Sequence, residues 1–176
     1  MFLDRLLKPR PAKVAGGKLY AAAVAQARSP AFYAQMGVHD SMEGRFELFT
    51  LHVALLLERM KGQGESAAEV AQETFNAYTR GLDDAFREIG VSDTAVGKKM
   101  KKLVGASYGR IKAFDEATVA LPDRSVLSAA LARTAFEERG EGDVEALTDY
   151  VVAARDGLAA LPLESLIQGE AQWPKA

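Results

Sequence analysis

The chain has 176 residues, a hydrophobic fraction of 48%, a charged fraction of 26% and a formal net charge of −2, which together are typical of a globular protein with one domain. It contains no cysteine, and this excludes disulfides, zinc sites with thiolate ligands, iron–sulfur clusters and a thiol nucleophile. The small net charge gives no overall reason to expect nucleic-acid binding, and no apolar run is long enough to span a bilayer.

The sequence pattern divides the chain into a helical domain and two tails. We expect residues 1–17 to form a flexible N-terminal tail, because Pro9 and Pro11 stop any helix there. Residues 18–168 form the helical domain, and residues 169–176 form a C-terminal tail. The N-terminus lacks a long apolar core and a small-residue cleavage site, so it does not resemble a secretory signal and we expect a cytoplasmic protein.

Helical periodicity of apolar side chains runs through almost the whole domain, and no segment alternates as a strand would. The pattern therefore predicts an all-α fold, a compact single-domain bundle of about seven helices. Helix starts are marked by Ser29 before Pro30, and by the spacings of Asp40 with Glu43 and of Ser66 with Glu69, which resemble capping boxes. The predicted helices cover residues 18–28, 30–36, 41–60, 66–89, 95–119, 124–138 and 143–160, with a short one after Pro162.

The predicted helix at 41–60 has apolar residues on two faces, which favours a central position in the bundle. In the predicted helix at 95–119, Gly105 and Gly109 are four positions apart, and we expect them to let a neighbouring helix approach closely. These expectations concern packing alone and assign no chemistry.

Both histidines lie in the stretch GVHDSMEGRFELFTLH, residues 37–52, together with several carboxylates. A carboxylate-bridged metal centre needs Glu-x-x-His pairs on two helices, but Glu47 and His52 are five positions apart and no second pair exists. Desolvation of Glu47 would suit acid–base catalysis, yet Arg45 is close enough in sequence to pair with it. We therefore expect no catalytic residue, no metal site and no cofactor. A small enzyme, or a haem- or lipid-binding bundle using Glu47 and His52, remains the alternative.

Between Gly97 and Ala113 the chain carries six basic residues and no acidic one. Like charges four apart on a helix repel slightly, so the helix tolerates a small destabilisation. The pattern fits either an ordinary solvated helix face or a surface for a phosphate-bearing partner, namely anionic lipid or ribosomal RNA.

Three ordered pieces of sequence resemble the ubiquinol–cytochrome c chaperone family over about residues 20–117. They are ARSPAFYAQMGVHDSMEGRFELFTLH, LDDAFREIGVSDTAVGKKMKK and YGRIKAFDEA. The resemblance implies an all-helical assembly factor that is not an enzyme and that binds newly made cytochrome b during biogenesis of the bc1 complex. It also implies a location in the cytoplasm or at the inner membrane surface.

Cytochrome b spans the membrane several times, so its cytoplasmic loops should be rich in Lys and Arg. We therefore expect carboxylates with apolar neighbours to capture such segments. The expected partner-binding residues are Phe32, Tyr33, Asp40, Glu43, Arg45, Glu47, Asp83 and Glu88. The residues expected to face a membrane or a ribosome are Lys98, Lys99, Lys101 and Lys102.

Overall fold

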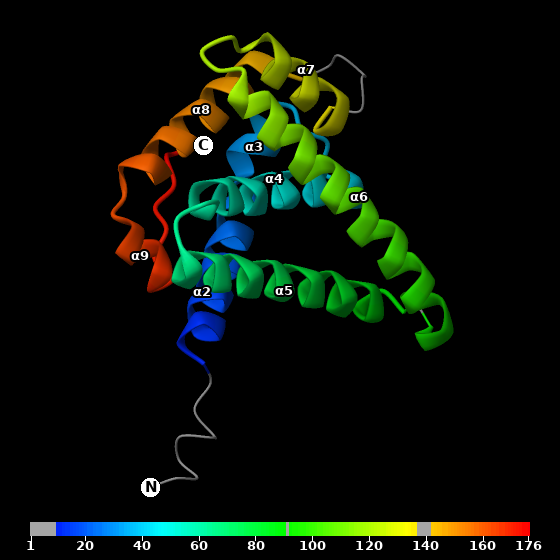
Figure 1. Ribbon diagram of the computed structural model, residues 1–176. Helices are drawn as coiled ribbons and strands as arrows, with labels where there is room; N and C mark the ends of the chain where they lie inside the picture. The colour runs from blue at the N-terminus through cyan, green and yellow to red at the C-terminus, as the bar shows by residue number, and fades with distance from the viewer. Residues whose placement is uncertain (1–9, 91, 137–141) are drawn as a thin grey trace, which may run out of the picture.

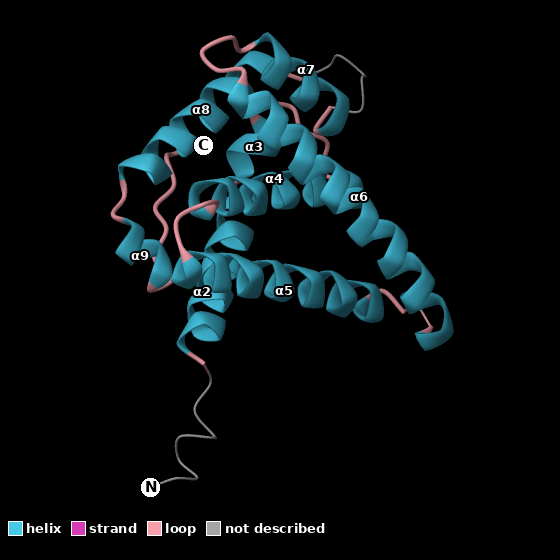
Figure 2. Cartoon of the chain, in the orientation of Figure 1, coloured by secondary structure: helices cyan, strands magenta, loops and turns pink. Residues whose placement is uncertain are grey.

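The computed structural model describes residues 10–90, 92–136 and 142–176, and every regular element within these ranges is a helix (Figures 1 and 2). This confirms the all-α prediction. None of the described helices is both long and apolar enough to cross a membrane. The helices are α2 (Pro11–Ala27), α3 (Pro30–Ala34), α4 (Met42–Met60), α5 (Glu65–Glu88), α6 (Asp93–Val119), α7 (Ser125–Thr134), α8 (Val144–Ala160) and α9 (Leu163–Ile167).

Helix α4 lies at the centre of the molecule, as its apolar faces predict. It contacts α2, α5, α6 and α8, and its side chains from Thr50 to Leu56 are all buried. Leu48 and Leu56 are completely inaccessible to solvent. Burial of a large aliphatic side chain contributes about 1.5–3 kcal/mol, so the core around α4 is the main source of stability.

Helix α2 begins at Pro11, seven positions earlier than the sequence predicted. Proline lacks an N–H group, but the first residue of a helix has no intrahelical acceptor for that group, so proline starts a helix as readily as it stops one. The helix crosses α5 at Gly16, where an added Cβ atom would lie only 2.6 Å from the backbone of Glu73 and Thr74. Residues 1–9 of the expected tail lie outside the described residues.

Helix α5 starts after Gly64, one residue before Ser66, so the predicted capping box between Ser66 and Glu69 does not form. The predicted end is confirmed: the last helical residue is Glu88, and Gly90 follows with φ of 80°, the left-handed conformation that glycine adopts most easily. Helices α4 and α5 are joined by a short loop and pack against each other. Figure 1 shows the two helices running in opposite directions.

The C-terminal residues pack against the bundle although the sequence predicted a tail from residue 169. The Gln26 side chain donates a hydrogen bond to the Pro174 carbonyl at 3.0 Å, and the Trp173 ring meets His52 edge to face at 5.0 Å between centroids. Figure 1 shows this segment in red, running back from α9 towards α8. It thus forms part of the wall around His52.

Candidate functional site

The start of α4 carries an exposed charged cluster. Ser41 caps the helix, accepting a hydrogen bond from the Gly44 N–H at 3.1 Å, so the cap lies one residue after the predicted Asp40. Asp40 instead accepts a hydrogen bond from Arg45 at 2.6 Å, and that bond lowers the pKa of Asp40 below its ordinary value. Glu43 is exposed in the first turn, where the helix dipole favours a negative charge.

Glu47 lies away from this cluster, in the interior. The sequence placed it among the carboxylates offered to a partner, but only 6% of the residue is exposed and Arg110 of α6 holds it, with Nη2 2.8 Å from Oε1. Hydrogen bonding to Glu47 raises the pKa of Arg110, so the guanidinium stays charged. The pair joins α4 to α6 and leaves no free carboxylate for a partner.

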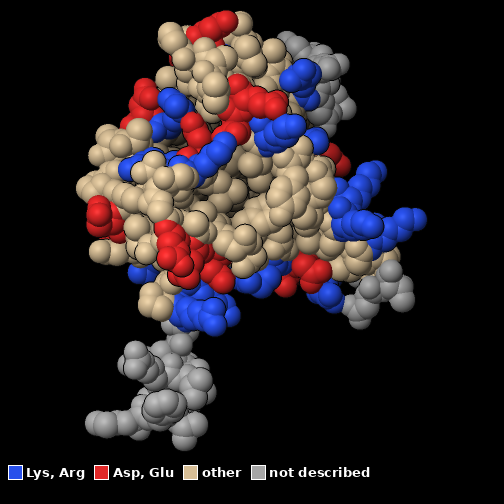
Figure 3. Space-filling model, in the orientation of Figure 1, with Lys and Arg blue, Asp and Glu red and all other residues tan. Residues whose placement is uncertain are grey.

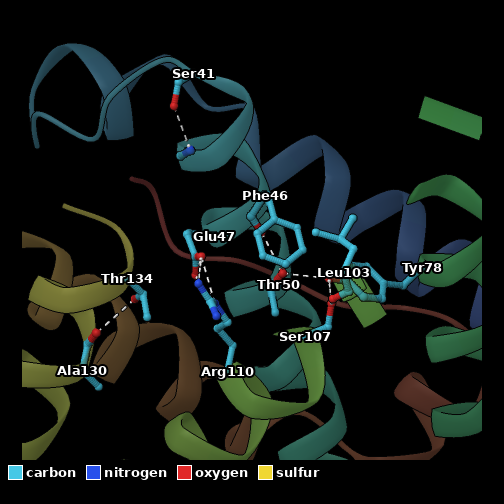
Figure 4. A network of polar contacts seen from close by, with 11 residues as sticks. Ser41, Phe46, Glu47, Thr50, Tyr78, Leu103, Ser107, Arg110, Ala130 and Thr134 are labelled. Atoms are coloured by element: carbon cyan, nitrogen blue, oxygen red, sulfur yellow. Dashed lines mark hydrogen bonds and ion pairs between the residues drawn. The ribbon is translucent and has the colours of Figure 1, made fainter. Parts of the chain in front are cut away.

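A chain of hydroxyl groups lies beside this ion pair (Figure 4). Tyr78 of α5 is 2.8 Å from the Thr50 hydroxyl of α4 and 2.7 Å from the Ser107 hydroxyl of α6. Thr50 and Ser107 each donate to a carbonyl of their own helix, and burial raises the pKa of Tyr78. This polar core holds α4, α5 and α6 at a fixed separation.

His52 is fully buried on the other side of α4. Its Nδ1 lies 2.7 Å from the Leu48 carbonyl, which can only accept, so Nδ1 carries the proton and Nε2 accepts from the Tyr150 hydroxyl at 2.8 Å. Burial lowers the pKa of His52 to about 4 and keeps the ring neutral. His52 faces α8 whereas Glu47 faces α6, so the two side chains do not converge on one site.

The two aromatic residues expected in the partner surface have structural roles. Phe32 has no exposed surface, and its ring contacts His52 and Tyr150 edge to face. The prediction that Phe32 lies at a surface is therefore wrong, because its ring completes the core beneath α4. Tyr33 is half-buried and donates a hydrogen bond to the Ala27 carbonyl at 2.8 Å.

Asp83 and Glu88 lie in the last part of α5. Asp83 pairs with Arg87 at 2.7 Å, and Glu88 is exposed. Both carboxylates lie on a different helix from Asp40 and Glu43, and the basic Arg87 lies between them.

The four lysines are all exposed in the first half of α6. Figure 3 shows basic side chains projecting from this end of the helix, and the Lys99 ammonium lies 5.9 Å from the centre of the Phe86 ring. The four lysines are Lys98, Lys99, Lys101 and Lys102. Farther along α6, a Cβ added to Gly105 or Gly109 would meet no atom within 4 Å. The predicted close approach of a neighbouring helix at these glycines is therefore absent from the described part of the chain.

An apolar groove that the sequence did not predict opens between α4, α5 and α6. Its volume is about 510 Å³, and most of its lining is apolar. In Figure 3 the centre of this face is hollow and tan, between rims that carry charged side chains. Aromatic residues in the wall include Phe75 and Tyr108, whose ring centroids are 5.0 Å apart, and 58% of Tyr108 is exposed. Apolar residues from three separate helices form the groove, so no local sequence signal could reveal it.

Among the described residues, no group of three or more His, Asp or Glu side chains is arranged to hold a metal ion. The groove walls likewise bring no histidine near a carboxylate. The arrangement that the structure offers is a surface for contact with another molecule, with charged ends and an apolar middle.

The curated relatives of the chain are assembly factors. It is 27% identical over 164 residues to ubiquinol-cytochrome c reductase complex assembly factor 1 of Mus musculus and also to that of Homo sapiens. These alignments cover 92% of this chain but only 55% and 54% of the two relatives, so the chain spans about half their length. The Xenopus laevis protein of the same name is 23% identical, with 92% of this chain and 81% of that protein covered.

A solved structure shares the whole fold. The crystal structure of the Cbp3 homolog from Brucella abortus superposes with a TM-score of 0.86 and 34% sequence identity, covering 99% of this chain and 97% of that one. The family model described as ubiquinol-cytochrome C chaperone matches residues 34–173, which include the start of α4, the groove and the lysines of α6. The chain therefore belongs to the ubiquinol–cytochrome c chaperone family.

Proposed function

We propose that this chain is an assembly chaperone of the bc1 complex and that it holds newly made cytochrome b. The membership of the family and the names of the relatives support the first part. The observation that carries the second part is the open apolar groove, because an exposed apolar concavity flanked by charged ends suits the temporary binding of another polypeptide.

Exposed carboxylates of α4 and α5 capture basic segments of the client in this proposal. Asp40, Glu43 and Glu88 present charge to solvent, and Arg45 pairs with Asp40 at the start of α4. Tyr33 ties α3 to the end of α2. Asp83 adds a carboxylate that is already shared with Arg87. Phe32 and Glu47 contribute only through the core, since both are buried.

Charge reversal at Asp40 and Glu43 should weaken capture of cytochrome b at least fivefold. Both side chains are exposed, and exposed ion pairs contribute little to stability, so D40K/E43K should fold normally. A matched control is E164K/E170K, which makes the same charge change at two exposed carboxylates in and after α9. Equal binding by the wild-type protein and D40K/E43K would refute the acidic surface.

Deletion of the gene in its host is the direct test of the function. We expect cytochrome b and quinol–cytochrome c reductase activity to fall together, and a plasmid-borne copy to restore both. Urea titration of D40K/E43K and of its control would separate loss of binding from loss of fold. Full yield of the bc1 complex in the deletion strain would rule out the proposed function.

A further inference from the structure

The groove between α4, α5 and α6 is lined by both large and small apolar side chains. The small ones are Ala54, Ala68 and Ala71, of which Ala54 is buried and Ala68 is exposed. Phe75 and Tyr108 form an aromatic wall on one side. Its volume of about 510 Å³ lies within the range of about 300–1,000 Å³ for ligand pockets, so it can take several side chains from one segment of a partner.

The charged side chains around the groove are paired within the chain. Four charged residues line it, and each has a partner of opposite sign. Lys61 pairs with Asp115 at 2.7 Å. Glu58 pairs with Arg155 at 2.9 Å and Lys112 with Glu116 at 3.7 Å. A charged occupant would lose its hydration here without gaining a free counter-charge. An uncharged apolar occupant has no such hydration to lose.

A second copy of the chain fits the groove poorly. The large apolar residues that are most exposed outside the groove belong to several different elements of the described structure. They are Val14, Met42, Ile89, Val119 and Val126. Such scattered side chains offer no continuous apolar ridge that could enter the groove of another copy.

We propose that the groove binds an uncharged apolar stretch from a membrane-spanning segment of the client before that segment enters the bilayer. The inference rests on the proposed function, which supplies a membrane-protein client. A membrane-spanning helix contains about 20 predominantly apolar residues, and these match the neutral apolar lining of the groove. The exposed carboxylates at the start of α4 then meet the charged loops of the client, so the two surfaces recognise different parts of one chain.

Because the chain contains no cysteine, a single introduced cysteine can report contacts at one chosen place. The test uses three single-cysteine variants of the full chain, each labelled with a photoactivatable maleimide and added to a translation reaction producing cytochrome b with membranes. Tyr108→Cys probes the groove, Met42→Cys probes the start of α4, and Val126→Cys probes α7. Mass spectrometry identifies the cross-linked peptide.

The expected result is a cross-link from position 108 to an uncharged membrane-spanning peptide of cytochrome b. Filling the groove with Ala68→Trp should reduce its yield at least fivefold. Ala85→Trp, at an exposed alanine of the same helix that does not line the groove, should change it less than twofold. Circular dichroism and urea titration of both variants would confirm that they fold.

Each other outcome has a defined meaning. A cross-link from position 108 to a charged loop, to lipid alone or to a second copy of the chain would overturn the inference and leave the proposed function standing. Capture of cytochrome b from position 42 or 126 but not from 108 would do the same. Failure of all three positions to reach cytochrome b would overturn the proposed function itself.

Discussion

His52 makes the stability of the protein depend on pH. In the unfolded chain its imidazole titrates near its ordinary pKa of 6.5, while burial lowers the pKa in the folded protein to about 4. The unfolded state therefore binds more protons between these values, and stability falls as pH drops from about 6.5 towards 4. We expect the free energy of unfolding to be about 2 kcal/mol lower at pH 5 than at pH 7 from this residue, at 1.36 kcal/mol per pKa unit.

Urea unfolding at both pH values, with His52→Gln as the comparison, measures this contribution. The variant keeps a side chain that can hydrogen-bond but has no titrating group at this position. The difference between its free energies of unfolding at pH 7 and pH 5 should therefore be about 2 kcal/mol smaller than that of the wild-type protein. The carboxylates contribute equally in both proteins and cancel in the difference. Identical pH profiles would show that His52 becomes protonated without unfolding the bundle.

The Glu47–Arg110 pair has unequal partners, since the Glu47 side chain is 7% exposed and the Arg110 side chain 36%. Arg110→Ala would leave a buried carboxylate without a counter-charge, whereas Glu47→Gln leaves a guanidinium that still reaches water. We expect Arg110→Ala to reduce stability by about 2–4 kcal/mol, below the upper end for fully buried pairs because of solvent screening, and Glu47→Gln to reduce it by less. Denaturant titration checks the order, and the reverse order would contradict the assignment of Glu47 as the buried partner.

At the scale of elements, the crossing of α2 and α5 depends on Gly16. Because an added Cβ would lie 2.6 Å from α5 backbone, Gly16→Ala should force the helices apart and destabilise the protein by about 1–3 kcal/mol. The neighbouring Gly17 supplies the control, since a Cβ there meets no atom within 4 Å. Gly17→Ala should stabilise the same helix by about 0.5–1 kcal/mol, because alanine is the better helix former. Equal effects of the two substitutions on the thermal midpoint would show that the crossing is not tight.

The helices were largely predictable because their signals are local. Apolar periodicity marks α4, and Gly90 follows the end of α5 as expected. Cap positions shifted by one or two residues, because several nearby residues can cap a helix and only the fold selects one. The start at Pro11 was missed because proline is compatible with both the end and the beginning of a helix.

The site was less predictable because it depends on contacts between distant residues. Glu47 and Arg110 are 63 positions apart, and nothing near Glu47 in the sequence indicates that this partner exists. Phe32 was misplaced at the surface because an aromatic residue beside a turn fits either the core or a binding face. The lysines of α6 were placed correctly in solvent, since four cations in one turn and a half cannot all be buried.

At the scale of the whole molecule, the groove and the lysines lie on the helices α4, α5 and α6, which the polar core of Tyr78 holds together. That the lysines face a phosphate-bearing surface, of the membrane or of the ribosome, stays a prediction from the sequence. A lysine near an anionic lipid surface contributes about 1 kcal/mol, so K98Q/K101Q/K102Q should bind vesicles of phosphatidylglycerol and phosphatidylcholine at least tenfold more weakly than the wild-type protein.

The control for that prediction removes the same charge elsewhere, with K13Q/K18Q/K175Q, whose lysines are exposed on α2 and at the C-terminus. Its co-sedimentation with the vesicles should change less than threefold, and both effects should shrink as salt rises, since charges at the surface are screened over about 8–10 Å at ordinary ionic strength. Parallel sedimentation with ribosomes distinguishes the two targets. If the lysines are only a solvated helix face, the wild-type protein and both variants should sediment equally. A difference between the two variants requires that the lysines of α6 contact phosphate, because both variants lose the same charge.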